Sequence, residues 1–188
     1  MRALLLLGML WLGACTNVPS TIPHATESEI TALSNALSAL SPHVDPAEAQ
    51  RAARIAFDYP IELRAAYGVT DPPLIHNAKV NRGSRPRGLC WHWADDLEAR
   101  LAQEDFQTLT LHRAIANSNN PILIEHSTVI VSARGAPMDH GIVTDPWRYG
   151  GQLFWAPTLE DSRYTWLPRQ QVWDTKAKKL KRRQSVQP

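Results

Sequence analysis

The sequence predicts one domain of the α+β class, with helices first and a mostly antiparallel sheet after them. Apolar residues recur at helical spacing in the first half of the chain and at strand spacing in the second half, where turn residues separate the strands. Because helices and strands occupy separate parts of the sequence, alternating βαβ units are not expected. The 188 residues suffice for a sizeable core, and a net charge of +2 gives no general case for nucleic-acid binding.

The first residues have the order of a secretory signal. One arginine precedes an apolar run that is shorter than the roughly 20 residues of a spanning helix. The run ends in Leu-Gly-Ala-Cys at Cys15, which resembles the lipobox of bacterial lipoproteins and implies a lipid on the Cys15 sulfur. We therefore expect a signal peptide over residues 1–14 and a tether over 15–25. The alternative is an ordinary signal peptide in which Cys15 has no role.

Start signals and apolar spacing predict four helices. Thr26 and Glu29 form a capping box, and Asp45-Pro46 combines a cap with a proline at the first helical position. Prolines and asparagines between the third and fourth helices predict an extended surface segment over 70–87. The predicted helices cover residues 27–41, 46–58, 61–68 and 90–103.

The remainder of the chain has the pattern of strands, followed by a basic tail. The predicted strands cover residues 106–112, 121–133, 140–146, 152–157 and 163–167. Residues 175–188 are rich in lysine and arginine and are expected to be a disordered, solvated tail, which leaves 26–174 as the folded domain. The functional alternative for the tail is contact with anionic lipid or cell-wall polymer.

Cys90 is the only thiol left if Cys15 carries a lipid. It then has no partner for an intramolecular disulfide, and an unpaired thiol outside the cytoplasm is either reactive or buried and inert. Its position at the predicted start of a helix favours a reactive thiol. Exposed N–H groups and the helix dipole stabilise a thiolate there and could also hold an oxyanion. The competing interpretation is a small buried hydrophobic side chain.

A thiolate mechanism needs an imidazole beside the sulfur, and His126 and His140 stand on predicted strands. If these strands pair around a turn near residue 135, His126 falls opposite Asp145, which would orient the ring. His140 would lie roughly 17 Å along the strand from Asp145. His126 is therefore the favoured base, and His140 is the alternative because the turn centre is assumed. His92 points to another side of the helix that Cys90 begins.

These residues resemble the transglutaminase-like branch of the papain-like cysteine enzymes. The matching segments are 88–94, 125–131 and 143–147, within about residues 84–150. The resemblance implies a papain-like fold with Cys90 as nucleophile, His126 as general base and acid, and Asp145 as the residue that orients it. No glutamine stands shortly before Cys90, so Asn81 or Ser84 is expected to supply the side-chain donor for the oxyanion.

Further residues bear on substrate and cofactor. The segment that ends at Cys90, Arg-Gly-Leu-Cys, also resembles the cysteine motif of arylamine N-acetyltransferases, which have the same triad order. Those enzymes use acetyl-CoA, which an exported protein would not meet, so the likeness supports the fold and not that activity. Trp91 and Trp147 flank triad residues and could wall a peptide-binding groove, although core packing is the competing role. Neither a metal nor a cofactor is expected, since no metal-binding motif is present.

The sequence therefore predicts a membrane-tethered cysteine hydrolase, a peptidase or amidase acting on envelope proteins or cell-wall peptides. Transglutaminase-like acyl transfer to an amine is a variant that the sequence does not separate from hydrolysis. Thr16 follows the anchor in place of aspartate, which by the lipoprotein resemblance implies the periplasmic face of the outer membrane in a Gram-negative host. The competing hypothesis is a non-catalytic envelope lipoprotein that binds a protein or cell-wall partner through its tryptophans and basic tail.

Overall fold

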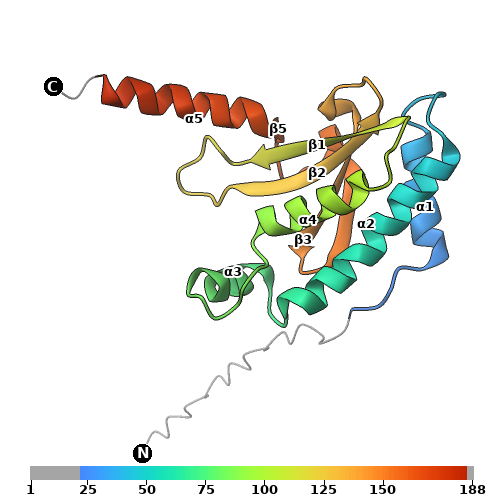
Figure 1. Ribbon diagram of the computed structural model, residues 1–188, viewed down its shortest axis with the longest axis horizontal. Helices are drawn as coiled ribbons and strands as arrows, with labels where there is room; N and C mark the ends of the chain where they lie inside the picture. The colour runs from blue at the N-terminus through green and yellow to red at the C-terminus, as the bar shows by residue number, and fades with distance from the viewer. Residues whose placement is uncertain (1–21, 186–188) are drawn as a thin grey trace, which may run out of the picture.

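Five antiparallel strands form the central sheet of the protein, in a computed structural model that describes residues 22–185 (Figure 1). Their order across the sheet is β4-β3-β2-β1-β5. The strands are β1 (Leu109–Ala116), β2 (His126–Ala133), β3 (Ile142–Tyr149), β4 (Gln152–Pro157) and β5 (Leu167–Pro168). The expected α+β class is confirmed. The predicted signal peptide and Cys15 lie outside the described residues.

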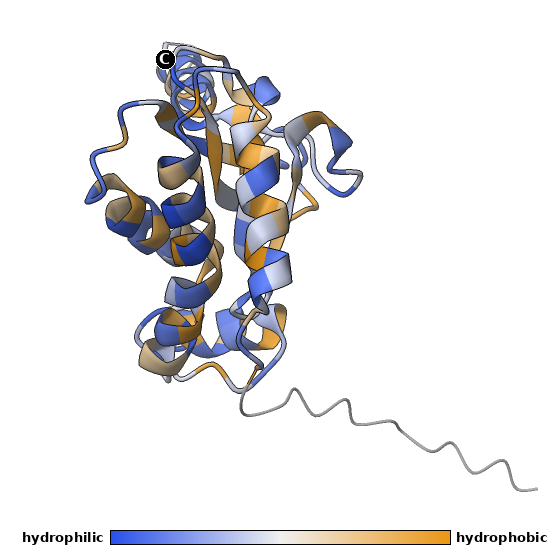
Figure 2. Cartoon of the chain, turned by 90° about the vertical axis from the view of Figure 1, so that its right-hand side faces the viewer, coloured by the Kyte–Doolittle hydropathy of each residue, from blue (hydrophilic) through white to orange (hydrophobic). Residues whose placement is uncertain are grey.

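Three of the five α-helices found between residues 22 and 185 cover one face of this sheet. They are α1 (Glu27–Ser38), α2 (Pro46–Tyr67) and α4 (Cys90–Ala102), whereas α3 (Pro73–Asn81) and α5 (Arg169–Gln184) lie at the margins (Figure 1). Figure 2 shows hydrophobic residues gathered on the strands behind the helices and hydrophilic residues on the outer helix surfaces. None of the helices within residues 22–185 is long and apolar enough to cross a membrane.

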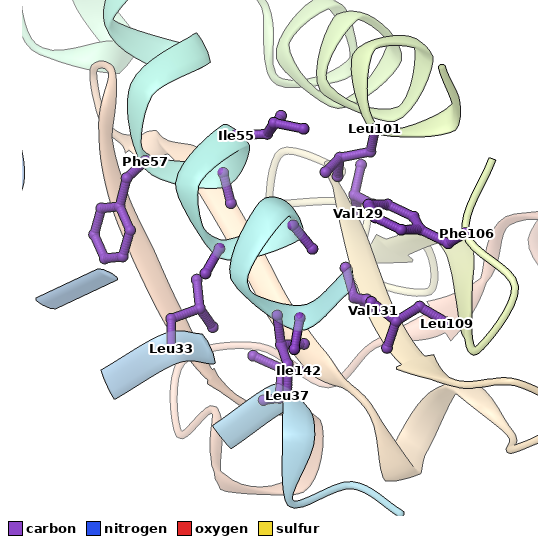
Figure 3. Packing of buried hydrophobic residues seen from close by; sticks show 14 of the residues in the cluster. Leu33, Leu37, Ile55, Phe57, Leu101, Phe106, Leu109, Val129, Val131 and Ile142 are labelled. Atoms are coloured by element: carbon purple, nitrogen blue, oxygen red, sulfur yellow. The ribbon is translucent and has the colours of Figure 1, made fainter. Parts of the chain in front are cut away.

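An aliphatic core fills the space between these helices and the sheet (Figure 3). Alanines of α2 allow α1 and α4 to pack closely against it, and strands β2 and β3 supply the opposite wall. The large side chains of this core include Leu33, Leu37, Ile55, Phe57, Leu101, Val129, Val131 and Ile142.

The opposite face of the sheet is also buried, which matters because part of the candidate site lies there. Ile130 of β2 and Val143 of β3 are direct cross-strand partners and pack with Trp166 in a second cluster. The 3-10 helices η1 (Met138–His140) and η2 (Thr158–Glu160) flank this side. Strand β2 is therefore buried on both faces.

The helix break predicted near residue 60 is wrong, because α2 runs through Pro60 without interruption. An interior proline removes a helical hydrogen bond and costs about 3 kcal/mol or more. Buried side chains on either side, such as Phe57 and Leu63, offset this cost by packing α2 into the core. The helix ends at Gly68, whose φ of 63° is a left-handed conformation that favours glycine.

The extended segment predicted over 70–87 is also wrong, since α3 occupies its centre. Pro73 stands at the first helical position, where a missing N–H group costs no hydrogen bond. His76 and Asn77 are buried, so α3 is held by tertiary contacts that no sequence period shows. The predicted strands also shift: β1 begins three residues late, at Leu109, and β5 has only two residues.

The basic tail is helical as far as Gln184, where the sequence predicts a disordered end. Helix α5 runs from Arg169 to Gln184, and its buried Val172 attaches its first turns to the body. Lysine and arginine are good helix formers, and three cations in the last turn complement the helix dipole.

Candidate active site

Cys90 is the first residue of α4, and a neighbouring histidine builds the turn that presents it. Nδ1 of His92 accepts hydrogen bonds from the backbone N–H groups of Gly88 and Leu89, each at 3.1 Å. A nitrogen that accepts these bonds cannot carry a proton. Burial lowers the pKa of His92, and the positive charge of Arg87 lowers it further. His92 is thus committed to the backbone as a helix cap.

The glycine before the nucleophile is required by close packing. Gly88 has a φ of 124°, and a Cβ atom there would lie 2.3 Å from Nε2 of His76. That imidazole bonds the carbonyl oxygen of Arg87 at 2.9 Å, and the indole N–H of Trp93 donates to the Gly88 carbonyl at 3.0 Å. Side chains of α3 and α4 therefore bond the two carbonyl groups of residues 87 and 88 and hold the chain just before Cys90.

Two backbone N–H groups at the start of α4 are available to a ligand. The first helical bonds come from the N–H groups of His92 and Trp93, and no hydrogen bond within residues 22–185 engages those of Cys90 and Trp91. A carbonyl oxygen that becomes negative beside the sulfur could accept from them. Asn81 is exposed at the end of α3, and it does not line the cavity over Cys90.

Ser84, the other proposed oxyanion donor, is exposed, and its hydroxyl donates to the carbonyl oxygen of Lys79 at 3.0 Å. It does not line the cavity over Cys90 either. The structure therefore brings neither side-chain candidate to the nucleophile.

His126 and Asp145 meet on the sheet face that lies away from the helices. Nε2 of His126 and Oδ2 of Asp145 are 2.6 Å apart, and the two side chains are 2% and 1% exposed. Along a strand, alternate residues share a face. His126 therefore lies on the same face as Ile130, and Asp145 lies on the same face as Val143, the partner of Ile130.

The register differs from the predicted one. The observed pairs include Val129 with Thr144, so one further step places Thr128 opposite Asp145. The direct opposition expected for His126 and Asp145 is therefore wrong, and the two residues are diagonal neighbours. The shift is two residues, an even number, so it moves the contact along the strand without changing its face.

Cys90 lies beside this pair at a cavity of about 320 Å3 that both Cys90 and His126 line. The Cys90 sulfur is 3.5 Å from the carbonyl oxygen of Glu125. Because Nε2 of His126 is engaged by Asp145, Nδ1 is the ring nitrogen left for the sulfur. This atom is buried and has no hydrogen bond of ordinary geometry among the described residues.

The charge state of His126 follows from these neighbours. Burial alone would lower the pKa of His126, but the negative charge and hydrogen bond of Asp145 and the interaction with Cys90 raise it to about 9. His126 is therefore protonated at neutral pH. An imidazolium beside a thiol stabilises the ionised sulfur, which is the form that acts as a nucleophile.

A second ion pair supports Asp145 from behind. Nε of Arg148 donates to Asp145 at 3.0 Å, and its terminal nitrogens donate to the two oxygens of Asp161 at 3.1 and 2.7 Å. Although burial raises the pKa of Asp161, hydrogen bonds from Arg148 and Trp166 lower it overall. Neither Arg148 nor Asp161 is predicted as a site residue from the sequence. The only signal for Arg148 was its place three residues after Asp145.

Aromatic rings surround the histidine. The centroids of Trp147 and Tyr164 lie 4.6 and 4.7 Å from that of His126. Trp147 is buried, and its indole N–H donates to Asn77 at 3.1 Å, so it packs against the imidazole. Trp91 is 47% exposed and lines the cavity over Cys90.

Two cavities meet at His126. The one over Cys90 is also bounded by Arg113, which is ion-paired with Asp95, and by residues of α5. The other, of about 460 Å3, is walled by Trp147 and Tyr164 and by apolar residues of the β1–β2 loop. The imidazole therefore stands between two spaces that could receive the two sides of a substrate.

His140, the alternative base, lies in η1 and not on a strand, is exposed, and lines neither cavity. Within residues 22–185, no group of three His, Cys, Asp or Glu side chains could hold a metal ion. No protein-family model, curated protein or solved structure matches this chain.

Proposed function

We propose that the protein is a cysteine hydrolase of amide bonds, in which Cys90, His126 and Asp145 form the catalytic triad. One observation carries the proposal: Cys90 begins a helix beside an imidazole whose other nitrogen is held 2.6 Å from a buried carboxylate. The order of the three residues and their elements is similar to that of the papain-like, transglutaminase-like enzymes. The papain-like fold is part of the proposal.

The reaction follows from the roles of these groups. The Cys90 sulfur attacks the substrate carbonyl carbon, and the backbone N–H groups at the start of α4 stabilise the oxygen that becomes negative. The C–N bond then breaks as His126 gives its proton to the leaving nitrogen, and a thioester remains. Water then attacks the thioester carbonyl carbon while neutral His126 takes a proton from the water. The C–S bond breaks, which releases the acid and leaves the Cys90 thiolate beside the protonated His126. An amine in place of water would give transglutaminase-like acyl transfer.

The proposed place of this reaction is the cell envelope. Lipidation of Cys15 would hold the domain at a membrane, at the periplasmic face of the outer membrane in a Gram-negative host, where envelope proteins and cell-wall peptides are within reach. Cells fed a labelled fatty acid should incorporate the label into the wild type and not into Cys15→Ser. Equal labelling of both would contradict the anchor.

The triad is tested by the alkylation of Cys90 with iodoacetamide across pH. The full chain with Cys15→Ser has Cys90 as its only thiol. We expect rapid alkylation to persist well below about pH 8.5, where a thiol in water titrates. His126→Ala should move the profile to higher pH, and His140→Ala, a matched exposed histidine, should leave it unchanged.

Turnover is tested with p-nitrophenyl acetate, which should release one p-nitrophenol per Cys90 in a burst. An alkylation profile of an ordinary thiol that His126→Ala does not move, with no burst, would favour a non-catalytic binding lipoprotein. If the burst is seen, the reaction is repeated with an added amine. Amide products in the mass spectrum would then identify acyl transfer.

A further inference from the structure

We propose that the β1–β2 loop and helix α5 form one surface that binds an anionic phospholipid bilayer. The proposal does not depend on catalysis at Cys90. It joins an apolar loop, a cationic helix and the contacts between them, all outside the triad.

The loop between β1 and β2 exposes three consecutive large apolar side chains. Ile122, Leu123 and Ile124 are 89%, 52% and 59% exposed. Single exposed apolar residues are common on proteins, but a contiguous group at a loop tip is typical of an interaction site.

Side chains of the same loop pair three of its backbone groups. Oδ1 of Asn120 accepts from the N–H groups of Ile122 and Leu123 at 2.9 and 3.3 Å, and the amide of Asn117 donates to the Ile124 carbonyl at 3.0 Å. Unpaired backbone groups are costly in a lipid environment. Because three of these groups are already paired, the loop can enter the interfacial region at lower cost.

Helix α5 supplies the charge. Its exposed cations are Lys176, Lys178, Lys179, Lys181, Arg182 and Arg183, and no acidic residue stands between Thr175 and Ser185. Trp173 and Leu180, seven residues apart on one side of the helix, are 50% and 58% exposed. A basic helix with aromatic and aliphatic side chains is suited to the boundary between headgroups and acyl chains.

The loop and the helix are contiguous. Nζ of Lys176 donates to the Glu125 carboxylate at 2.7 Å, and Ser118 and Asn119 line a small cavity together with Lys179. Figure 1 shows the β1–β2 loop and α5 projecting to the same side of the molecule. Apolar and cationic groups therefore face outward together.

This combination favours a bilayer over a soluble polyanion. A polyanion would engage the cations and leave the isoleucines in water, whereas a bilayer offers anionic headgroups with hydrocarbon beneath them. Each cation near such a surface strengthens binding roughly fivefold. The cavity over Cys90 is bounded by Glu125 and Trp173, one from each element, so docking would bring its mouth towards the membrane.

Co-sedimentation with vesicles tests the surface, using the full chain with Cys15→Ser. The N-terminal apolar run is the same in every variant, so only differences count. We expect binding at least tenfold stronger to phosphatidylcholine containing one quarter phosphatidylglycerol than to phosphatidylcholine alone, and a loss of this preference at high salt. Lys178→Glu with Lys181→Glu should abolish the preference, whereas the charge-matched Lys178→Arg with Lys181→Arg should retain it.

A variant with a polar loop tests whether the surface binds a bilayer or only a polyanion. Ile122→Ser, Leu123→Ser and Ile124→Ser together should weaken binding to the anionic vesicles about tenfold, and Leu159→Ser, an exposed leucine in η2, should not. Equal binding of the parent to both vesicle types would overturn the proposal. So would a loop variant that binds like its parent, because the cations alone would then account for the binding, as they would for a soluble polyanion. Circular dichroism confirms that each variant is folded.

Discussion

The sheet face under α1, α2 and α4 is packed with aliphatic side chains, whereas the opposite face holds ionisable groups among aromatic rings. On the first face, Leu33, Val129 and their neighbours need only shape and hydrophobicity. On the second, His126, Asp145 and Arg148 are each almost fully buried and are held by hydrogen bonds. One face of the sheet thus supplies the aliphatic core, and the other face buries ionisable groups.

Charge balance explains how the second face can be buried. Asp145 and Asp161 contribute two negative charges and Arg148 one positive charge, so a protonated His126 makes the group neutral. The raised pKa of His126 is consistent with this requirement. The same arrangement that makes the buried group tolerable thus supplies the proton that the proposed mechanism needs.

The largest loss of stability is expected for Arg148→Met. It leaves two buried carboxylates without their cation, and removing one partner of a buried ion pair costs about 3–5 kcal/mol. Urea unfolding at neutral pH measures the change. Arg148→Met with Asp161→Asn should recover part of the loss, because one unpaired carboxylate is removed. A single-variant cost below about 1 kcal/mol would show that the network does not hold this face together.

Leu37→Ala tests the aliphatic face. The side chain is 1% exposed, and a deletion of this size leaves a cavity that costs about 3 kcal/mol. Unfolding in urea should show that loss while the pH profile of Cys90 alkylation stays unchanged. A displaced profile would mean that the two faces are not independent.

The stability contributed by His126 should depend on pH in a defined direction. Its folded pKa of about 9 exceeds the unfolded value of about 6.5, so the contribution is fully present below about pH 6.5 and is lost as pH rises through about 9. The difference amounts to at most about 3 kcal/mol. Unfolding curves at both limits should show it in the wild type, and Asp145→Asn should remove most of it. A variant that keeps the full pH dependence would rule out Asp145 as its source.

The smallest effect is expected far from the site, at the cap of α1. Thr26→Ala removes the capping box with Glu29 and should cost about 1 kcal/mol in the free energy of unfolding. Alkylation of Cys90 should be unaffected. Thr31→Ala, an exposed residue inside the same helix, is a control that keeps the cap.

The aliphatic face was largely predictable, because helical and strand periods report which residues face a core. The capping signals located the starts of α1 and α2, and α4 begins at Cys90 as expected. The predicted register is wrong by two residues, but the contact between His126 and Asp145 is still found. A shift by an even number of residues leaves each side chain on the same face of the sheet. An error of one residue would have separated them.

The charged face was not predictable to the same degree. Asp161 reaches Arg148 from a segment of irregular structure, where no period relates sequence to position. Pro60 inside α2 and the helix α3 depend on tertiary packing that outweighs local preference. Helical spacing predicts only the direction in which His92 points, whereas its bonds to the backbone before Cys90 depend on the folded turn.

The helix cap formed by His92 makes the stability of the turn before Cys90 depend on pH. Its pKa is lowered, because burial and Arg87 disfavour the protonated ring. Below the pKa of about 6.5 that a histidine has in the unfolded chain, His92 is protonated in the unfolded state but stays neutral in the folded turn. Acid therefore lowers the stability of this turn. His126 has the opposite dependence, and its contribution is lost in alkali. The opposite pH dependences of the two imidazoles thus leave a neutral pH range in which the turn before Cys90 is held in place and His126 is protonated.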